Sequence, residues 1–340
     1  MARAFAEAAH RARRGYRLRR VRSERRHTAA SAAAVNYNLR RGLAIAATVA
    51  LFAALPSGAG ENGRPTRDDV GDPITVKPGP CRFVSLAPGT TAMLYAAGAA
   101  HCLVGTIAHS TEPVDAVKLP IVGDAETLDF EQLMTLRPTA VVVAVDVVQR
   151  MRIDRIKAMG IPVYQVHVTR LVGMPESIRR LGALAGTQAI ADREADALNA
   201  GLEALGARYR TRSPIRVLYQ IWDRPIYTIG GRHVITDALQ LCGAINIFSD
   251  LETAAPAVTR EAAVLRDPEL ILASSPPGAA DEWLAEWRRY PAMTAVKNGQ
   301  LVSYVDERID RMGPSVIEAT GNLCAVIDKA RTARAAVSNR

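Results

Sequence analysis

The 340-residue sequence lacks the short motifs by which common classes of enzyme are recognised. It contains no G-x-S-x-G nucleophile motif, no G-x-x-x-x-G-K-[ST] phosphate loop and no H-E-x-x-H zinc pair. The pair Gly230-Gly231 precedes a predicted helix and indicates a tight turn rather than a dinucleotide fingerprint. Catalysis therefore has little support. The competing hypothesis is a secreted α/β enzyme that uses His109 and the acidic residues around Glu307.

The N-terminal region has no apolar run long enough to cross a membrane comfortably. Residues 43–55 form an apolar run of about 13 residues, whereas a spanning helix needs about 20. The run follows a basic arm and is followed by Ser57 and Ala59, at the −3 and −1 positions of a cleavage site. No Cys follows closely, which argues against a lipid anchor. We expect a secretory signal peptide and a soluble periplasmic protein; the alternatives are an uncleaved anchor and a weak twin-arginine signal at Arg40-Arg41.

Lysine is absent from the first 41 residues, which hold 12 arginines and two glutamates. This arm carries a net charge of +10 and leaves −1 of the total of +9 for the rest of the chain. The body of the protein therefore gives no support to a basic groove for nucleic acid. Nucleic-acid binding through the arm requires that the arm stays on the mature protein.

C-x-x-C spacing is also absent, which disfavours a cysteine zinc site. The four cysteines suit an oxidising compartment and allow three pairings. Cys81 and Cys102 each precede a short β-like run, Cys242 ends an apolar helix, and Cys324 lies on the C-terminal helix. We favour Cys242 with Cys324 and Cys81 with Cys102; the alternative for the second pair is two buried free thiols.

What the chain does contain is two passes of alternating β-branched runs and helical stretches. Strands divided by helices indicate an α/β fold with two parallel-sheet lobes. A stretch without Pro between the passes predicts one long helix that can bridge two domains. The expected organisation is a basic arm and signal peptide, a flexible linker, an N-terminal lobe, the inter-lobe helix and a C-terminal lobe, at residues 1–59, 60–80, 81–186, 187–210 and 211–335.

The two passes share a repeated segment. "LDFEQLMTLRPTAVVVA" begins at Leu128, and "VTREAAVLRDPELILAS" begins at Val258. In each, a Glu follows a helix-capping residue by two positions and precedes a Pro by seven, so Glu131 and Glu261 should sit in the first turn of equivalent helices. Interaction with the helix dipole explains either Glu alone but not a matched pair in two lobes.

These motifs resemble a known family, the periplasmic substrate-binding proteins of ABC importers for vitamin B12, haem and ferric siderophores. The resemblance covers roughly residues 81–330 and is carried by "RFVSLAPGTTAMLYAAGA", "LPIVGDAETLDFEQLMTLRP", "YTIGGRHVITDALQLCGAINIF", "PAVTREAAVLRDPELI" and "GPSVIEATGNLC". The last three are most similar to cobalamin-binding members, in which a Cys pair joins the positions of Cys242 and Cys324. The resemblance implies that Glu131 and Glu261 dock onto arginines of a dimeric membrane permease, which is coupled to a cytoplasmic ATPase.

The resemblance also implies a ligand cleft between the lobes, at positions 89, 109, 125, 144, 227, 255 and 307. Gly89, His109, Tyr227 and Glu307 are the expected ligand contacts among them, whereas the alanines at 125, 144 and 255 cannot stack on a corrin. Trp222 leaves the end of a predicted strand and can supply an aromatic surface; its alternative role is core packing. His109 can coordinate cobalt or haem iron, or simply be solvated.

The expected function is a monomeric receptor that captures a corrinoid and delivers it to an ABC importer. Haem or a ferric siderophore is the alternative ligand. No enzymatic cofactor, resident metal or nucleic-acid partner is expected.

Overall fold

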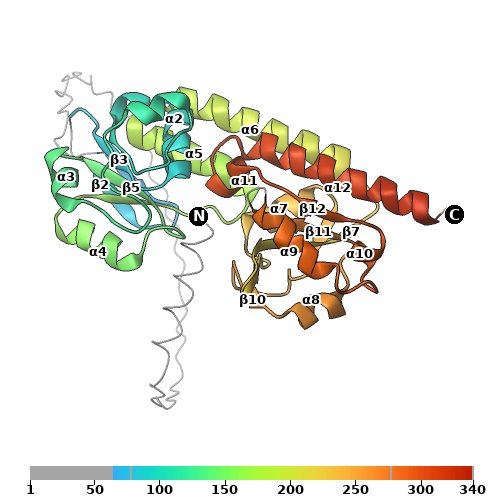
Figure 1. Ribbon diagram of the computed structural model, residues 1–340. Coiled ribbons are helices and arrows are strands. Elements are labelled where there is room, and N and C mark those ends of the chain that lie inside the picture. Colours follow the sequence, from blue (N-terminus) through green and yellow to red (C-terminus); the bar gives the residue numbers. More distant parts are fainter. Residues whose placement is uncertain (1–63, 77–78, 276–277, 339–340) are drawn as a thin grey trace, which may run out of the picture. The chain divides into compact units, whose positions relative to one another are not determined.

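The computed structural model describes residues 64–76, 79–275 and 278–338 (Figure 1). The predicted signal peptide and basic arm lie outside these residues. Among the helices of the described ranges, none has both the length and the apolar character needed to cross a bilayer.

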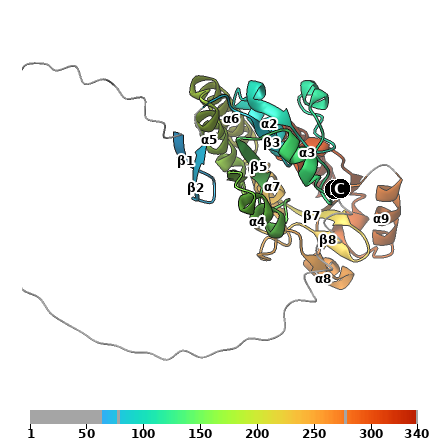
Figure 2. The ribbon, with the colours of Figure 1, turned by 90° about the vertical axis from the view of Figure 1, so that its left-hand side faces the viewer.

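An antiparallel hairpin opens the described chain, formed by β1 (Arg64–Arg67) and β2 (Pro73–Val76), and β1 lies beside α5 (Met174–Ala185) (Figure 2). Its turn is fixed by two carboxylates. Asp68 is buried and accepts a 2.9 Å hydrogen bond from Nε2 of Gln165, and Asp69 accepts from Ser177 Oγ. The flexible linker expected over residues 60–80 is therefore corrected for residues 64–76, because side chains of the N-terminal lobe hold this stretch in place.

The N-terminal lobe contains a four-stranded parallel sheet in the order β4-β3-β5-β6. Each strand contains at least one Val, and nearly all of the strand residues are buried, as expected when helices cover a parallel sheet. The strands and the helical segments between them are β3 (Phe83–Ser85), α2 (Pro88–Ala96), η1 (Ala100–Cys102), β4 (Leu103–Gly105), η2 (Val114–Lys118), α3 (Phe130–Thr135), β5 (Ala140–Ala144), α4 (Arg150–Ala158), β6 (Val163–Val166) and η3 (Leu171–Gly173).

The C-terminal lobe contains a six-stranded mixed sheet in the order β10-β8-β7-β11-β12, with β9 beside the first half of β7. Its elements are β7 (Ile215–Trp222), β8 (Ile226–Thr228), α7 (Val234–Leu241), β9 (Ala244–Asn246), β10 (Ala257–Val258), α8 (Arg260–Arg266), β11 (Leu270–Ala273), α9 (Ala279–Trp287), α10 (Thr294–Lys297), β12 (Leu301–Ser303), α11 (Glu307–Arg311) and α12 (Val316–Ser338).

The α/β architecture with parallel-sheet cores is thus confirmed, with one difference in the second sheet. Strand β8 pairs with β7 antiparallel rather than parallel, and β10 pairs with β8 in the same way. Only residues 223–225 separate β7 from β8. Three residues can close a hairpin but cannot carry the crossover that a parallel neighbour requires.

Helix α6 (Gln188–Tyr209) lies where a long helix was expected and is about 33 Å long at 1.5 Å per residue. It contacts α2 and α5 of the N-terminal lobe and α7 and α12 of the C-terminal lobe. One helix therefore supports both lobes.

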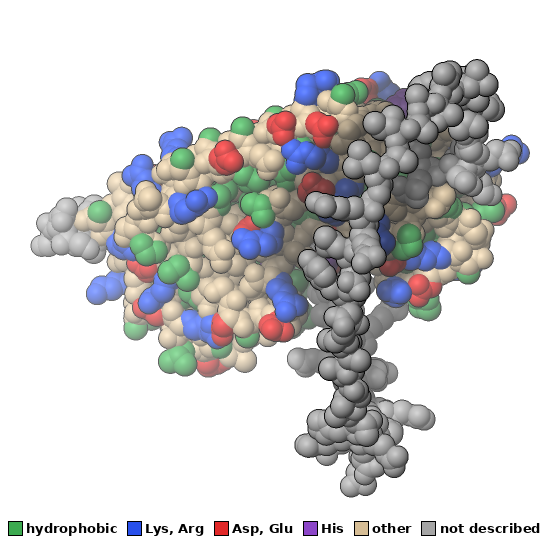
Figure 3. Space-filling view, turned by 180° about the vertical axis from the view of Figure 1, so that it is seen from behind, with side chains coloured by type: hydrophobic (Ala, Val, Ile, Leu, Met, Phe, Trp, Pro, Cys, Tyr) green, Lys and Arg blue, Asp and Glu red, His purple; other side chains and the backbone are tan. Residues whose placement is uncertain are grey.

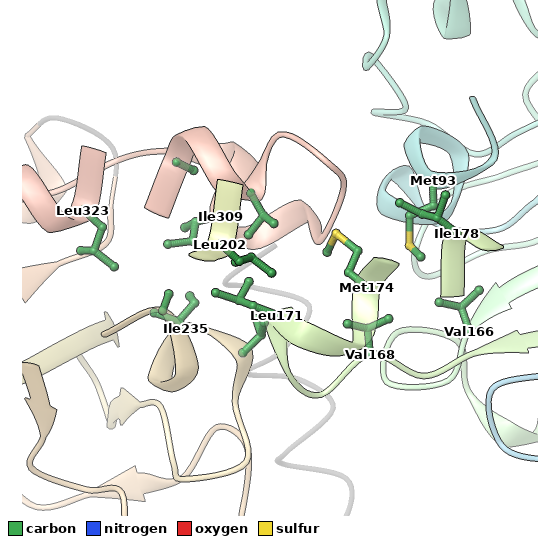
Figure 4. Close-up of a cluster of buried hydrophobic side chains, with 14 of the residues drawn as sticks. Met93, Val166, Val168, Leu171, Met174, Ile178, Leu202, Ile235, Ile309 and Leu323 are labelled. Carbon is green, nitrogen blue, oxygen red and sulfur yellow. The ribbon is translucent and has the colours of Figure 1, made fainter. Parts of the chain in front are cut away.

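A continuous cluster of buried apolar side chains also joins the two lobes (Figure 4). Met93 and Ile178 belong to its N-terminal part, Ile235 and Leu323 belong to its C-terminal part, and Leu202 of α6 lies between them. Because these side chains are 5 % exposed or less, separating the lobes would return apolar surface to water.

The repeated segment forms matching structure in the two lobes. Asp129 caps α3 by accepting a 2.9 Å hydrogen bond from Gln132 N, and Thr259 caps α8 by accepting a 3.1 Å bond from Ala262 N. The positions after the helices match as well, and the two residues that precede the prolines have left-handed backbone, with φ of 47° at Arg137 and 42° at Asp267. The placement of Glu131 and Glu261 in the first turns of equivalent helices is confirmed.

Both favoured cysteine pairs are disulfides, Cys81–Cys102 and Cys242–Cys324. The parallel pairing of Phe83 with Leu103 brings the first pair together, as the position of each Cys before a strand predicted. The second bond joins α7 to α12 across a sequence separation of 82 residues. In the chain-entropy account, a loop of that length contributes about 4 kcal/mol to the free energy of unfolding.

Charged side chains of both signs are mixed on one face of the described surface. Figure 3 shows Lys and Arg interspersed with Asp and Glu on the face opposite to that of Figure 1. This distribution agrees with the near-neutral charge of the chain outside its basic arm.

Candidate functional site

The candidate site is a cavity of about 870 Å³ between the two lobes. Residues at or just beyond the carboxyl ends of β5, β6, β7 and β11 line it, together with the first residues of α2 and α7. The crevice outside the carboxyl ends of the strands is the usual position of ligands in open α/β sheets. Its volume lies at the upper end of the range for small-molecule pockets.

Aromatic surface in the cavity comes from the C-terminal lobe. Trp222 at the end of β7 and Tyr227 of β8 both line it and are half-buried. Trp222 also meets the ring of Trp283 edge to face, with centroids 6.0 Å apart. Trp222 therefore packs on the core and also forms part of the cavity wall, and its contact with a ligand stays a prediction.

The charged groups of the cavity are paired with opposite charges. Arg170 Nη2 lies 2.9 Å from Asp237 Oδ1, and Arg232 Nη2 lies 3.6 Å from Glu252 Oε1. Arg311 pairs with Glu307. Two further lining residues, His167 and Asp146, approach to 3.3 Å between Nδ1 and Oδ2. The wall offers hydrogen-bonding groups without an excess of either charge.

Some of the residues expected at the cleft line the cavity, and others lie outside it. Gly89, Trp222 and Tyr227 line the cavity, as do the alanines at 144 and 255. His109, Ala125 and Glu307 do not belong to its lining.

These three residues are exposed at positions outside the cavity. His109 lies beyond β4, in a turn with φ of 67°. Ala125 is exposed, and its carbonyl oxygen accepts a 2.8 Å hydrogen bond from Arg152 Nη1. Glu307 is 70 % exposed and reaches the cavity only through its ion pair with Arg311.

The charge run around Glu307 has a structural role. Asp306 caps α11 by accepting a 3.2 Å hydrogen bond from Arg308 N, and its carboxylate also accepts from the guanidinium of Arg308. These hydrogen bonds hold the pKa of Asp306 below its usual range. Arg311, at the end of this run, lines the cavity, whereas Asp306, Glu307 and Arg308 do not belong to its lining.

Gly89 lies where the two lobes touch beside the cavity. A Cβ atom at this position would overlap the carbonyl oxygen of Arg311 and approach the main chain of Met312. Nearby, Arg311 Nη1 donates a 2.9 Å hydrogen bond to Thr111 Oγ1, and Ser315 Oγ lies 2.9 Å from Glu112 Oε2. The absence of a side chain at Gly89 therefore permits a direct main-chain contact between α2 and the end of α11.

Sequence reasoning missed four polar residues of the wall, namely Asp146, His167, Arg170 and Asp237. Asp146 lies just beyond the end of β5, and His167 directly follows β6. The rule that ligands bind beyond the carboxyl ends of parallel strands would have found them.

His233 lines the cavity at the start of α7. Its Nδ1 accepts a 3.2 Å hydrogen bond from Ile235 N, so the ring caps the helix. Burial lowers the pKa of His233 to about 4, because the protonated ring would lose its hydration. The ring is neutral at pH 7.

This burial predicts a pH-dependent stability. The unfolded chain takes up a proton at His233 near its usual pKa of about 6.5, whereas the folded chain does so near 4. The contribution to the free energy of unfolding is therefore fully present above about pH 6.5 and is lost as the pH falls through 4, on the order of 3 kcal/mol in all.

Urea unfolding between pH 7 and pH 4 measures the effect. His233→Asn keeps a capping side chain without a titrating group, so its loss of stability with falling pH should be smaller than that of the wild type. His233→Ala should show the same reduced slope and an added cost of about 1 kcal/mol at pH 7 from the lost cap. An unchanged slope in His233→Asn contradicts this assignment.

The paired glutamates lie on helices outside the cavity. Glu131 and Glu261 are exposed, and among the described residues neither carboxylate has an ion-pair or hydrogen-bond partner. Exposed apolar residues accompany them on the same helices, Met134 at 47 % and Leu265 at 87 %. Each lobe thus presents a free carboxylate beside an apolar side chain.

Within the described ranges, the one group of three side chains suited to hold a metal ion is Cys81, His101 and Cys102. The two sulfur atoms of this group are joined in a disulfide. They are therefore not free to act as thiolate ligands.

Comparison with known proteins gives consistent matches. The profile described as "Periplasmic binding protein" matches residues 83–307. A vitamin B12-binding protein of Vibrio cholerae is 27% identical over 256 residues, which cover 75% of this chain and 92% of the relative. The crystal structure of the periplasmic vitamin B12 binding protein BtuF of Vibrio cholerae aligns with a TM-score of 0.68 at 27% identity, over 75% of this chain and 99% of that one. The periplasmic haem-binding protein HutB of the same species shares the fold, with a TM-score of 0.63 at 22% identity over 73% and 99% of the two chains.

Proposed function

The chain belongs to the periplasmic binding protein family, and from this premise we propose that it is the receptor of an ABC importer for a corrinoid. The observation that carries the proposal is the inter-lobe cavity of about 870 Å³ with its aromatic wall and paired charges. The vitamin B12-binding relatives support the choice of ligand.

The charges of the cavity favour a corrinoid over haem. Haem carries two propionates, and burying each anion would require a cationic partner. Arg170, Arg232 and Arg311 of the wall are each engaged by a carboxylate of this chain. A corrinoid carries neutral amide side chains around its ring, and paired charges can exchange hydrogen bonds with amides without leaving a buried charge unpaired.

Delivery is proposed to use Glu131 and Glu261, one from each lobe. Their matched positions at the starts of α3 and α8 suit a dimeric permease with one contact for each lobe. The apolar side chains of Met134 and Leu265 add contact area beside the charges. The leader at residues 1–59, a periplasmic location and the division into lobes at 81–186 and 211–335 belong to the same proposal.

Titration of the mature protein with cyanocobalamin, haem and ferric siderophores tests the function. We expect cyanocobalamin to quench tryptophan fluorescence stoichiometrically and without turnover, because Trp222 lines the cavity. Tyr227→Ala should weaken binding by about two- to tenfold through the loss of aromatic contact.

Trp222→Phe is the matched control for the fluorescence signal. It should reduce the quenching while dialysis and absorbance still detect binding, because Trp222 is the tryptophan that lines the cavity among the described residues. Haem binding without a corrinoid response would transfer the assignment to haem. Turnover of a ligand would favour the enzyme, and failure of every macrocycle and siderophore would overturn the proposed ligand.

A further inference from the structure

His167 lies where a ligand in the cavity would meet the N-terminal lobe. It directly follows β6, lines the cavity, and its side chain is 39 % exposed. Its main chain is held from behind, because its N–H donates a 3.1 Å hydrogen bond to Asp69 of the N-terminal hairpin turn. The position of this imidazole is therefore fixed by the sheet and by the hairpin.

A carboxylate lies beside one nitrogen of this ring. Asp146 Oδ2 is 3.3 Å from His167 Nδ1. The two residues are neighbours because the ends of β5 and β6 are joined by the 3.1 Å hydrogen bond from Val145 N to Val166 O. A carboxylate beside Nδ1 favours the proton on that nitrogen and leaves the lone pair of Nε2 available, the arrangement common to histidines that coordinate metals.

The second histidine of the cavity has the opposite arrangement. His233 uses Nδ1 as an acceptor for Ile235 N–H, so the proton of the neutral ring is on Nε2. That nitrogen has no lone pair to give to a metal. His109, the histidine predicted from the sequence, lies outside the cavity lining.

We propose that His167, oriented by Asp146, donates Nε2 as an axial ligand to the metal of a macrocycle bound in the cavity. The inference deepens the proposed function and rests on it. Trp222 and Tyr227 contact the ligand from the C-terminal lobe, whereas the metal bond comes from the N-terminal lobe. The C-terminal lobe thereby recognises the ligand through aromatic contact, and the N-terminal lobe recognises it through coordination of the metal.

The step is a ligand exchange without electron transfer. In aquacobalamin, the bond between cobalt(III) and its axial water breaks and the water leaves. The lone pair of His167 Nε2 forms the new bond to the metal. Imidazole is a suitable donor for such transition metals.

Absorbance titration with aquacobalamin and cyanocobalamin tests the assignment. The wild type should shift the aquacobalamin spectrum as imidazole replaces water, and cyanocobalamin should bind without that shift because its cyanide does not readily exchange. His167→Ala should still bind aquacobalamin, but without the spectral shift and with an affinity at least about tenfold lower than that of the wild type. Its affinity for cyanocobalamin should change by less than about twofold.

Two further variants separate coordination from a merely structural role. Asp146→Asn should reduce the aquacobalamin shift and weaken binding by about tenfold, because it removes the carboxylate that orients the ring. His109→Ala, which removes an exposed imidazole outside the cavity, should behave as the wild type. A spectral shift that persists in His167→Ala, or binding of aquacobalamin without any shift, overturns the inference.

The outcomes distinguish this inference from the proposed function. Tryptophan quenching by both cobalamins without a His167-dependent shift preserves the receptor and removes the axial ligand. Absence of quenching by either cobalamin contradicts the corrinoid receptor. Ferric haem is then the remaining probe, and a haem spectrum that changes in the wild type but not in His167→Ala supports the axial donor with the other macrocycle. Binding of no macrocycle overturns both proposals.

Discussion

Ligand uptake into cells should be abolished when Glu131 and Glu261 are both changed to Lys, while the purified receptor keeps its ligand affinity within about twofold. Both carboxylates are exposed and lie outside the cavity lining. Neither forms the cap of its helix, because Asp129 and Thr259 do so. The reversal should therefore cost only about 0.3–1 kcal/mol at each helix end while it replaces attraction to permease arginines by repulsion.

The matched control carries the same change in net charge. Glu282, in the first turn of α9, and Glu194, on α6, are exposed and have no partner among the described residues. Glu194→Lys with Glu282→Lys should leave both uptake and affinity near the wild-type values. Uptake that survives the reversal of Glu131 and Glu261 would reduce them to helix-end electrostatics. Equal losses of binding and uptake would argue against separate docking and ligand sites.

Gly89→Ala should have the next largest effect, although it adds only one methyl group. The new Cβ would overlap the carbonyl oxygen of Arg311, which is main chain and cannot rotate away. The end of α11 would have to move off α2, and with it Arg311 and Met312 of the cavity wall. We expect the free energy of unfolding to fall by about 1–3 kcal/mol, as for other overpacked contacts, and ligand affinity to fall as well.

Thermal unfolding and ligand titration measure the two effects. Gly173→Ala is the matched control, because a Cβ there has no heavy atom within 4 Å and the backbone φ is −83°. It should change neither quantity appreciably. Wild-type stability and affinity in Gly89→Ala would show that the lobes do not touch at this point in solution.

Local patterns were sufficient to predict much of the fold. Runs of β-branched residues located the strands, and the capping residues Asp129 and Thr259 located the helices that carry the paired glutamates. These features depend on neighbours within a few positions. The antiparallel β8 was missed because the short turn at residues 223–225 was not weighed against the rule for parallel crossovers.

Features that depend on distant partners escaped prediction. Asp68 and Asp69 were predicted to be linker residues, and their burial is explained by partners about 100 positions away, such as Gln165 and Ser177. The residues of the site were hard to predict for the same reason. His109 lies four residues beyond the end of β4 and outside the cavity lining, whereas His167 directly follows β6 and lines the cavity. Which of the two histidines lines a cavity between lobes depends on tertiary structure, which sequence periodicity does not contain.

The apolar cluster that continues from one lobe into the other has a consequence for how a permease would recognise a loaded receptor. A hinge built on α6 and a shared core resists large rotation, so we expect empty and loaded receptors to present Glu131 and Glu261 at nearly the same spacing. Docking alone would then discriminate poorly between the two forms. Empty receptor would compete for the same permease, and the rate of import would depend on the ratio of loaded to empty receptor rather than on the amount of loaded receptor alone.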